Sequence, residues 1–107
     1  MAYLDYFTKV FQYLLTIPKG KVVTYGQIAE HLGNKGLSRL VGNILHRNPD
    51  GDTYPCYKVV NCKGKLAKEF VFGGRDVQKI LLEKEGIEVV DYTVDLKKYR
   101  YIEDVKF

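Results

Sequence analysis

Two short helical patterns joined by a tight glycine-containing turn constrain the fold of this chain more than any other feature. Thr24 followed by Gln27 fits a capping box, in which each side chain bonds to the other residue's backbone at the start of a helix. That helix ends at Gly33 and Asn34, which favour a left-handed C-cap. Asn34 can then cap a second helix. The sequence therefore predicts a helix-turn-helix over about residues 24–47.

The second helix of this pair, expected over about residues 35–47, has one apolar face and one face of small residues. The apolar face recurs at helical spacing, through Leu37, Leu40, Val41, Ile44 and Leu45. The small face combines Gly36, Ser38 and Gly42 around a single long cation, Arg39. Glycine inside a helix costs about 1 kcal/mol relative to alanine, so Gly42 indicates that some other group approaches the helix closely there. A plain solvated helix pair is the alternative.

The charge distribution over the same region is strongly basic. Between residues 17 and 48 a single acid, Glu30, stands against five cations: Lys19, Lys21, Lys35, Arg39 and Arg47. The whole chain carries a net charge of +4. A basic face of this kind suits neutralisation of phosphates, so the pattern favours a nucleic-acid partner without demanding one.

A proline followed by a cysteine and a β-branched run is the feature most suggestive of chemistry. Pro55 fixes its own backbone, and Val59 and Val60 favour a strand, so we expect an active-site strand over about residues 54–60 with Cys56 at its mouth. A buried structural cysteine is the alternative. Cys62, the other cysteine, is not at CxxC spacing, so we expect two free thiols, no metal and no cofactor.

The remaining patterns complete a mostly α-helical fold. A helix is expected over residues 3–17, ending before Pro18, from the spacing of Tyr3, Leu4, Phe7, Val10, Phe11, Leu14, Leu15 and Ile17. Another is expected over about residues 75–85 with Gly86 as its C-cap, and a hairpin turn over residues 61–65. The predicted class is mostly α with a short β-hairpin, a single helix-turn-helix (winged-helix-like) domain over residues 1–107. Neither a membrane span nor a secretory leader is expected.

These motifs, taken in order, resemble the methylated-DNA–protein cysteine methyltransferases, which repair 6-O-alkylguanine. The resemblance covers about residues 3–90 and rests on Ile17-Pro18-x-Gly20-x-Val22-x-Thr24-Tyr25-Gly26-x-Ile28-Ala29, Arg39-x-Val41-Gly42, Asn48-Pro49, Pro55-Cys56-x-Lys58-Val59-Val60, Gly73-Gly74 and Leu82-x-x-Glu85-Gly86. The short chain and its tail, Val94-Asp95-Leu96-x-x-Tyr99, are more similar to the alkyltransferase-like proteins, a branch that senses the same lesions without repairing them.

The resemblance implies a role for each matching position. Cys56 would accept the alkyl group, Glu85 would end the charge relay, and Asn48 would brace the active-site loop. Tyr25 would contact the rotated base, and Arg39 would occupy the gap left in the base stack. The implied DNA-binding set is Thr24, Tyr25, Lys35, Ser38, Arg39 and Gly42, entering the minor groove. The implied guanine pocket is formed by Tyr25, Val59, Val71, Phe72 and Gly73.

Two departures place the chain between the two branches. The family's Pro-Cys-His-Arg-Val has become Pro-Cys-Tyr-Lys-Val, with Tyr57 and Lys58, whereas alkyltransferase-like proteins replace the cysteine that this chain keeps. Tyrosine, with an ordinary pKa of about 10, cannot take a proton from a thiol at neutral pH. Losing a positioned general base typically costs about 10²–10⁴ in rate. Tyr57 therefore predicts slow chemistry at Cys56.

The expected function is recognition of alkylated guanine in duplex DNA, flipping of that base, and slow stoichiometric transfer of its alkyl group to Cys56. A lesion sensor that transfers nothing is the first alternative, and a plain helix-turn-helix regulator with a structural Cys56 is the second. We expect a monomer that acts on double-stranded DNA, with other repair proteins as further candidate partners. The expected location is the cytoplasm, at the nucleoid, or the nucleus in a eukaryote.

Overall fold

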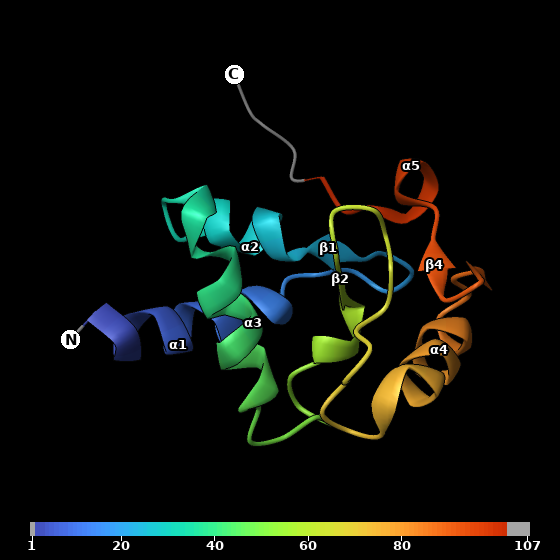
Figure 1. Cartoon of the computed structure of the whole chain (residues 1–107), viewed down its shortest axis with the longest axis horizontal. Coiled ribbons are helices and arrows are strands. Elements are labelled where there is room, and N and C mark those ends of the chain that lie inside the picture. The colour runs from blue at the N-terminus through green and yellow to red at the C-terminus, as the bar shows by residue number, and fades with distance from the viewer. Residues whose placement is uncertain (1, 103–107) are drawn as a thin grey trace.

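The computed structural model describes residues 2–102, in which helices dominate (Figure 1). The helices are α1 (Ala2–Leu14), α2 (Tyr25–His31), η1 (Lys35–Leu37), α3 (Ser38–His46), η2 (Cys56–Lys58), α4 (Gly74–Lys84) and α5 (Leu96–Tyr99), of which η1 and η2 are 3₁₀ turns. The strands are β1 (Val23–Thr24), β2 (Val59–Val60), β3 (Val89–Val90) and β4 (Thr93–Val94). The predicted fold class, mostly α with a short β-hairpin, is confirmed. The predicted domain boundary extends to residues 1 and 103–107, outside the described part.

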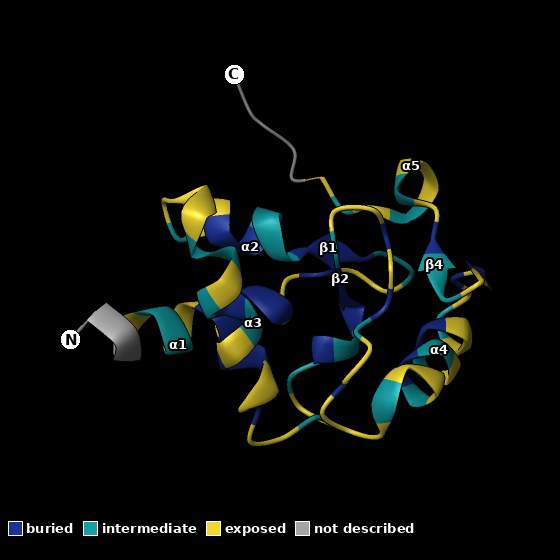
Figure 2. Ribbon diagram, in the orientation of Figure 1, coloured by how far each residue is buried: buried dark blue, intermediate teal, exposed yellow. Residues whose placement is uncertain are grey.

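A two-residue parallel pairing of β1 with β2 lies at the centre of the molecule (Figure 1). Successive strand residues point to opposite faces, so this short pairing divides two apolar clusters. Val23 and its partner Val59 belong to the cluster formed with α1, α2 and α3. Val22 and Val60 belong to the cluster formed with α4, β3 and β4. Figure 2 shows this seam buried between more exposed helices.

The N-terminal helix is shorter than its apolar pattern predicts. Regular α1 ends at Leu14, and 3₁₀-type bonds such as Ile17 N to the carbonyl of Leu14 carry the chain to Pro18. The apolar face is buried at Val10, Phe11, Tyr13, Leu14 and Ile17. Leu15, predicted to widen it, is instead 57% exposed because it lies beyond the helical stripe. The side chains of Tyr3 and Leu4 lie outside the described part.

The predicted helix-turn-helix is present, with the expected caps. The Thr24 hydroxyl accepts from the backbone N–H of Gln27 at 3.1 Å. The backbone N–H of Thr24 donates to the side-chain oxygen of Gln27 at 3.0 Å, which completes the capping box. Gly33 takes φ +102°, the left-handed conformation that ends α2. The Asn34 side chain accepts from Gly36 N at 2.8 Å and thereby caps η1, which leads directly into α3.

The predicted strand over residues 54–60 is wrong for its first half. Cys56 begins the 3₁₀ turn η2, and only Val59–Val60 forms a strand. Pro55, with φ −77° and ψ 69°, lies at the centre of an inverse γ-turn in which Cys56 N donates to the carbonyl of Tyr54 at 2.8 Å. The rigid placement of Cys56 by the proline therefore holds, but through a turn.

The hairpin occurs later in the chain than predicted. Residues 61–65 do form a turn, closed by Asn61 N donating to the carbonyl of Lys65 at 3.0 Å, but β2 pairs with β1 rather than with the returning chain. The hairpin consists of β3 and β4, joined through Asp91 and Tyr92 at φ 51° and 56°. Lys65 bridges to Thr93 of that hairpin, so the returning chain finds its partner there.

The helix predicted over about residues 75–85 is confirmed to within one residue as α4. Glu85 is its C-cap, and Gly86 follows with φ +85°. The buried face differs from the prediction, since Ile80 is 51% exposed while the polar Gln78 is fully buried. No helix among residues 2–102 has the length and apolar character needed to cross a membrane.

Candidate functional site

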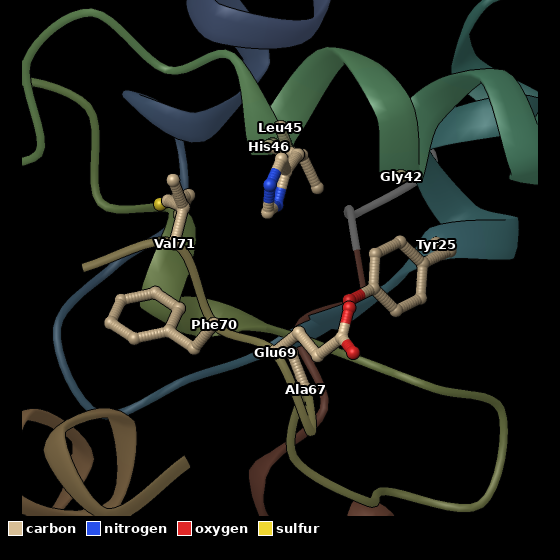
Figure 3. A pocket seen from close by; sticks show the side chains of 9 residues that line it. Tyr25, Gly42, Leu45, His46, Ala67, Glu69, Phe70 and Val71 are labelled. Carbon is tan, nitrogen blue, oxygen red and sulfur yellow. The ribbon is translucent and has the colours of Figure 1, made fainter. Parts of the chain in front are cut away.

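Cys56 lies at the junction between the two halves of the molecule, where it lines two neighbouring cavities. The first cavity, of about 60 Å³, lies between the helix-turn-helix and the loop that follows β2 (Figure 3). Its other lining residues are Tyr25, Gly42, Leu45, His46, Ala67, Glu69, Phe70 and Val71. The second cavity, of about 420 Å³, adjoins Cys56 and Phe70 on the side of α4 and is mainly apolar. Cys56 is 6% exposed.

The side chain of Asn48 braces the loop that carries Cys56. Its amide group donates to the carbonyl of Tyr54 at 2.8 Å, and its oxygen accepts from Asp50 N at 2.9 Å. The carbonyl of Tyr54 therefore accepts from both Asn48 and the Cys56 backbone N–H. Burial raises the pKa of the Cys56 thiol, and the neighbouring Asn48 amide partly opposes that shift. The bracing position predicted for Asn48 agrees with this geometry.

Tyr57, Lys58 and Glu85 form a partly buried cluster immediately beside the cysteine, with Lys58 as its buried member. The Tyr57 hydroxyl donates to Glu85 Oε2. Lys58 Nζ lies 3.1 Å from Glu85 Oε1, and Gly20 N donates to the same oxygen at 2.9 Å. The ammonium group also donates to two carbonyl oxygens in the turn after α1, each at 3.2 Å. The cluster thus joins three segments that are distant in sequence.

The electrostatics of this cluster decide which partner can take a proton. Burial raises the pKa of the Tyr57 hydroxyl, and the hydrogen bond to Glu85 raises it further. Burial alone would raise the pKa of Glu85, but hydrogen bonds from Tyr57, Gly20 and Lys58 outweigh it and lower that pKa. At neutral pH Tyr57 is therefore a protonated donor and Glu85 an ionised acceptor. In this state Tyr57 cannot withdraw a proton from Cys56.

Gln78 is a positioning residue that the sequence did not reveal. Its side-chain oxygen accepts from Ala67 N at 2.8 Å, and its amide group donates to the carbonyls of Tyr57 and Val59 at 2.9 and 3.1 Å. A fully buried amide must be hydrogen-bonded, and here its partners are the turn of Cys56 and the loop across the cavity. The available signal was a polar residue within the apolar stripe of α4.

The predicted DNA-binding residues fall into two groups. Lys35, Ser38 and Arg39 lie at the start of η1 and α3 with solvent access, and Gly42 lies against the Tyr25 ring, where an added Cβ would meet Tyr25 Cε1 at 4.0 Å. Thr24 is different, because its side chain is 6% exposed and occupied by the capping box. The structure therefore removes the Thr24 side chain from the candidate contacts.

The predicted guanine pocket is only partly assembled at the first cavity. Tyr25 and Val71 line it, but Val59 is 1% exposed in the core, Phe72 lines the second cavity, and Gly73 is the N-cap of α4 and lines neither. The loop after β2 turns back at Phe70, which explains why Val71 and Phe72 face different cavities.

Residues of the first cavity that the sequence did not single out come from two elements. His46, the last residue of α3, and Glu69, in the opposing loop, both reach it (Figure 3). Burial raises the pKa of Tyr25, and negative charge on Cys56 would raise it further, so the tyrosine hydroxyl is a donor there. Among the described residues, no three acidic, histidine or cysteine side chains are grouped to hold a metal ion.

Comparison with known proteins agrees with the motifs and the geometry. Residues 5–87 match the family model described as 6-O-methylguanine DNA methyltransferase, DNA binding domain. A DNA base-flipping protein of Vibrio parahaemolyticus is 40% identical over 100 residues, covering 91% of this chain and 96% of its own. A methylated-DNA–protein-cysteine methyltransferase of Methanosarcina acetivorans is 40% identical over 77 residues, covering 72% of this chain and 48% of its own. The chain thus spans about half of that longer relative.

The fold has a close counterpart among solved structures. The crystal structure of S. pombe Atl1 in complex with damaged DNA containing O6-carboxymethylguanine superposes with a TM-score of 0.85 at 32% identity, covering 92% of this chain and 96% of that one. The family resemblance predicted from the motifs is thereby confirmed. This chain belongs to the 6-O-methylguanine DNA methyltransferase family, whose DNA-binding domain it contains.

Proposed function

We propose that this chain binds duplex DNA carrying 6-O-alkylguanine and takes the damaged base into the first cavity, which Tyr25 and Cys56 line. It then transfers the alkyl group to the Cys56 thiol once per molecule. The observation that carries the proposal is a braced cysteine lining a cavity between a helix-turn-helix and a facing loop. DNA binding follows from the family, and relatives are named for base flipping and for methyl transfer. Such a protein would act wherever the genome is kept.

The transfer is a single displacement at carbon. The Cys56 sulfur, as thiolate, attacks the alkyl carbon, an S–C bond forms, and the bond between that carbon and guanine O6 breaks. The electron pair stays on O6, and the base is restored to guanine once a proton is taken up. A thioether does not release its alkyl group, so each molecule acts once. The protonated Tyr25 hydroxyl is available as a donor in the same cavity.

Two features make this reaction slow. Burial raises the pKa of Cys56, so the thiolate fraction at neutral pH is small. Tyr57, in the position where the family has histidine, donates its proton to Glu85 and cannot accept one from the thiol. A missing general base lowers the rate by about 10²–10⁴, while orientation of the thiol beside a bound base is retained. A stoichiometric reaction at rare lesions tolerates such a rate.

Mass spectrometry of the full chain after incubation with a methylguanine duplex tests the proposal. We expect one methyl group per molecule, located on the peptide that contains Cys56 and absent from a Cys56→Ala variant. The exposed Cys62 is an internal control, because methylation there would report non-specific alkylation. An unmodified Cys56 in a protein that still binds the damaged duplex would contradict transfer.

The second candidate is a lesion sensor that binds and does not transfer. The hydrogen bond from Tyr57 to Glu85 favours it, because it occupies the carboxylate that a histidine relay would need. The likeness to Atl1, solved with damaged DNA, favours it as well. Preferential binding of damaged duplex without a Cys56 adduct would establish the sensor. Equal binding of damaged and undamaged duplex would instead indicate a plain helix-turn-helix regulator.

A further inference from the structure

A third cavity, of about 460 Å³, adjoins the one beside Cys56 and shares two of its lining residues, Tyr25 and Ala67. Its walls come from the turn and loop after β2, the start of α4, and the tip of the β3–β4 hairpin. Of the residues that line this cavity, only Tyr25 belongs to the helix-turn-helix. Because the two cavities share lining residues, a strand that placed one nucleotide in the first cavity would pass beside this one.

The cavity is strongly basic. Lys65, Lys68 and Arg75 line it, against a single acid, Asp91. The ion pairs within residues 2–102 are Lys35 with Glu30 and Lys58 with Glu85, so none of these three cations has a carboxylate oxygen within 4.0 Å. Cations that gather without carboxylate partners are available to an external anion. We call this surface, defined by Lys65, Lys68 and Arg75, the basic groove.

Arg75 stacks on a tyrosine ring at the edge of the groove. Its guanidinium group lies 4.0 Å from the centre of the Tyr92 ring, and the Tyr92 hydroxyl donates to Asp76 Oδ1 at 2.6 Å. Asp76 is thus engaged by the tyrosine, while Arg75 keeps its N–H groups. A stacked guanidinium presents these donors in one plane, which matches the oxygens of a phosphate.

We propose that the basic groove binds the sugar-phosphate backbone of the damaged strand on one side of the flipped nucleotide. This inference rests on the function proposed above. Charge complementarity, the stacked and unneutralised Arg75, and continuity with the cavity of Cys56 through Tyr25 and Ala67 all favour a phosphodiester chain as the occupant. The contacts would add to those of the helix-turn-helix and lie on a separate part of the surface.

The salt dependence of DNA binding tests the groove. Removing one phosphate-binding cation lowers the slope of log affinity against log salt by about 0.9 for duplex DNA. The double variant Lys65→Ala/Lys68→Ala should therefore lower the slope for an alkylguanine duplex by about 1.8. Its matched control, Lys84→Ala/Lys97→Ala, removes the same charge from exposed lysines at the end of α4 and in α5, outside the groove. The control should leave the slope within about 0.3 of the wild type.

Shortened duplexes identify the flank. With the lesion placed near one end or the other, the variant should differ from wild type only on the duplex that retains the flank bound by the groove. An unchanged slope in the variant, an equal fall in the control, or equal differences on both shortened duplexes would overturn the proposal. The first of these results would leave an acidic protein as the alternative ligand.

The same titrations separate this inference from the proposed function. Wild-type preference for damaged over undamaged duplex measures the function, whereas the difference between the two double variants measures the groove. Loss of preference in the wild type would refute lesion recognition even if the groove contributed to the slope. Arg75→Lys gives a second readout independent of net charge, since lysine cannot stack and bind in the same plane, and we expect roughly threefold weaker binding to the damaged duplex.

Discussion

The helix-turn-helix surface and the Tyr57–Lys58–Glu85 cluster both contain a lysine–glutamate pair, but in opposite environments. Lys35 and Glu30 lie 3.7 Å apart with side chains 75% and 57% exposed. Lys58 and Glu85 lie 3.1 Å apart with side chains 6% and 12% exposed. An exposed pair of this kind contributes about 0–1 kcal/mol, whereas removing one partner of a buried pair costs about 3–5 kcal/mol.

The difference in exposure between the two pairs indicates that the two regions have different roles. On the helix-turn-helix surface, Lys35 has only a weak, exposed ion pair, which it could exchange for a contact with a phosphate. In the Tyr57–Lys58–Glu85 cluster these polar groups already have internal partners, so the cluster stabilises the fold. Changes on the surface should therefore alter DNA affinity alone, and changes in the cluster should alter stability or chemistry.

The largest effect expected is a loss of stability in Glu85→Gln. The substitution keeps the shape of the side chain and an oxygen to accept from Gly20, but its NH2 group cannot accept the Tyr57 proton, and the buried Lys58 loses its counter-charge. We expect the free energy of unfolding to fall by about 3–5 kcal/mol, measured by urea denaturation at neutral pH. Glu83→Gln, an exposed glutamate on the same helix, is the matched control and should change it by less than about 0.5 kcal/mol.

The difference in stability between wild type and Glu85→Gln should depend on pH. The pKa of Glu85 is lower in the folded state than in the unfolded state. The contribution of its charge to the free energy of unfolding is therefore fully present above the pKa of the unfolded state, and it is lost as the pH falls through the pKa of the folded state. The gap between wild type and Glu85→Gln should therefore narrow in acid. A constant gap would mean that the pair does not stabilise the fold through its charge.

Tyr57→His should give the next largest effect, on chemistry instead of stability. The side chain at position 57 already reaches Glu85, so an imidazole there gains an orienting carboxylate. Single-turnover transfer from a labelled methylguanine duplex should speed up roughly 10-fold or more, within the range of a general base. Tyr57→Phe, which removes the hydroxyl without supplying a base, is the control and should bring no such gain.

This gain should vanish in a Cys56→Ala background and shrink in Glu85→Gln, while DNA affinity barely changes. If Tyr57→His binds the lesion tightly and still places no label on Cys56, the transfer proposal is wrong and the sensor takes its place.

Arg39→Ala addresses the binding surface and should weaken binding without affecting the fold. Arg39 is exposed at the start of α3 among small residues, and we expect it to fill the gap left by a flipped base. Flipping a paired base costs a few kcal/mol, and replacing part of the lost stacking should be worth about tenfold in affinity for damaged duplex. The loss on single-stranded DNA with the same lesion should be smaller. Arg47→Ala, at the other end of α3, is the control; equal losses on both substrates would make Arg39 a phosphate clamp.

Lys35→Ala should give the smallest effect. Its pair with Glu30 is exposed, so stability should stay within about 0.5 kcal/mol of wild type. If Lys35 contacts a phosphate, the slope of log affinity against log salt should fall by about 0.9. Glu30→Gln frees the lysine without removing it and should leave that slope intact. An unchanged slope in Lys35→Ala would exclude Lys35 from the interface.

Features that depend on neighbours in sequence could be predicted from the sequence itself. The capping box at Thr24, the glycine that ends α2, and the length of α4 follow from local backbone preferences, which act over a few residues. The family motifs that contain Cys56 and Asn48 could likewise be identified from the sequence. The candidate functional residues could therefore be named, though not all of them placed.

Only the tertiary structure decided how distant segments meet. β2 pairs with β1 instead of folding back on itself, Val59 enters the core, and Phe72 faces a different cavity from Val71. Strand partners and cavity walls depend on which apolar faces can be buried together, and that competition involves the whole chain. The bonds of Gln78 and the contact of Tyr57 with Glu85, 28 residues away, exist because buried polar groups must find partners wherever packing supplies them.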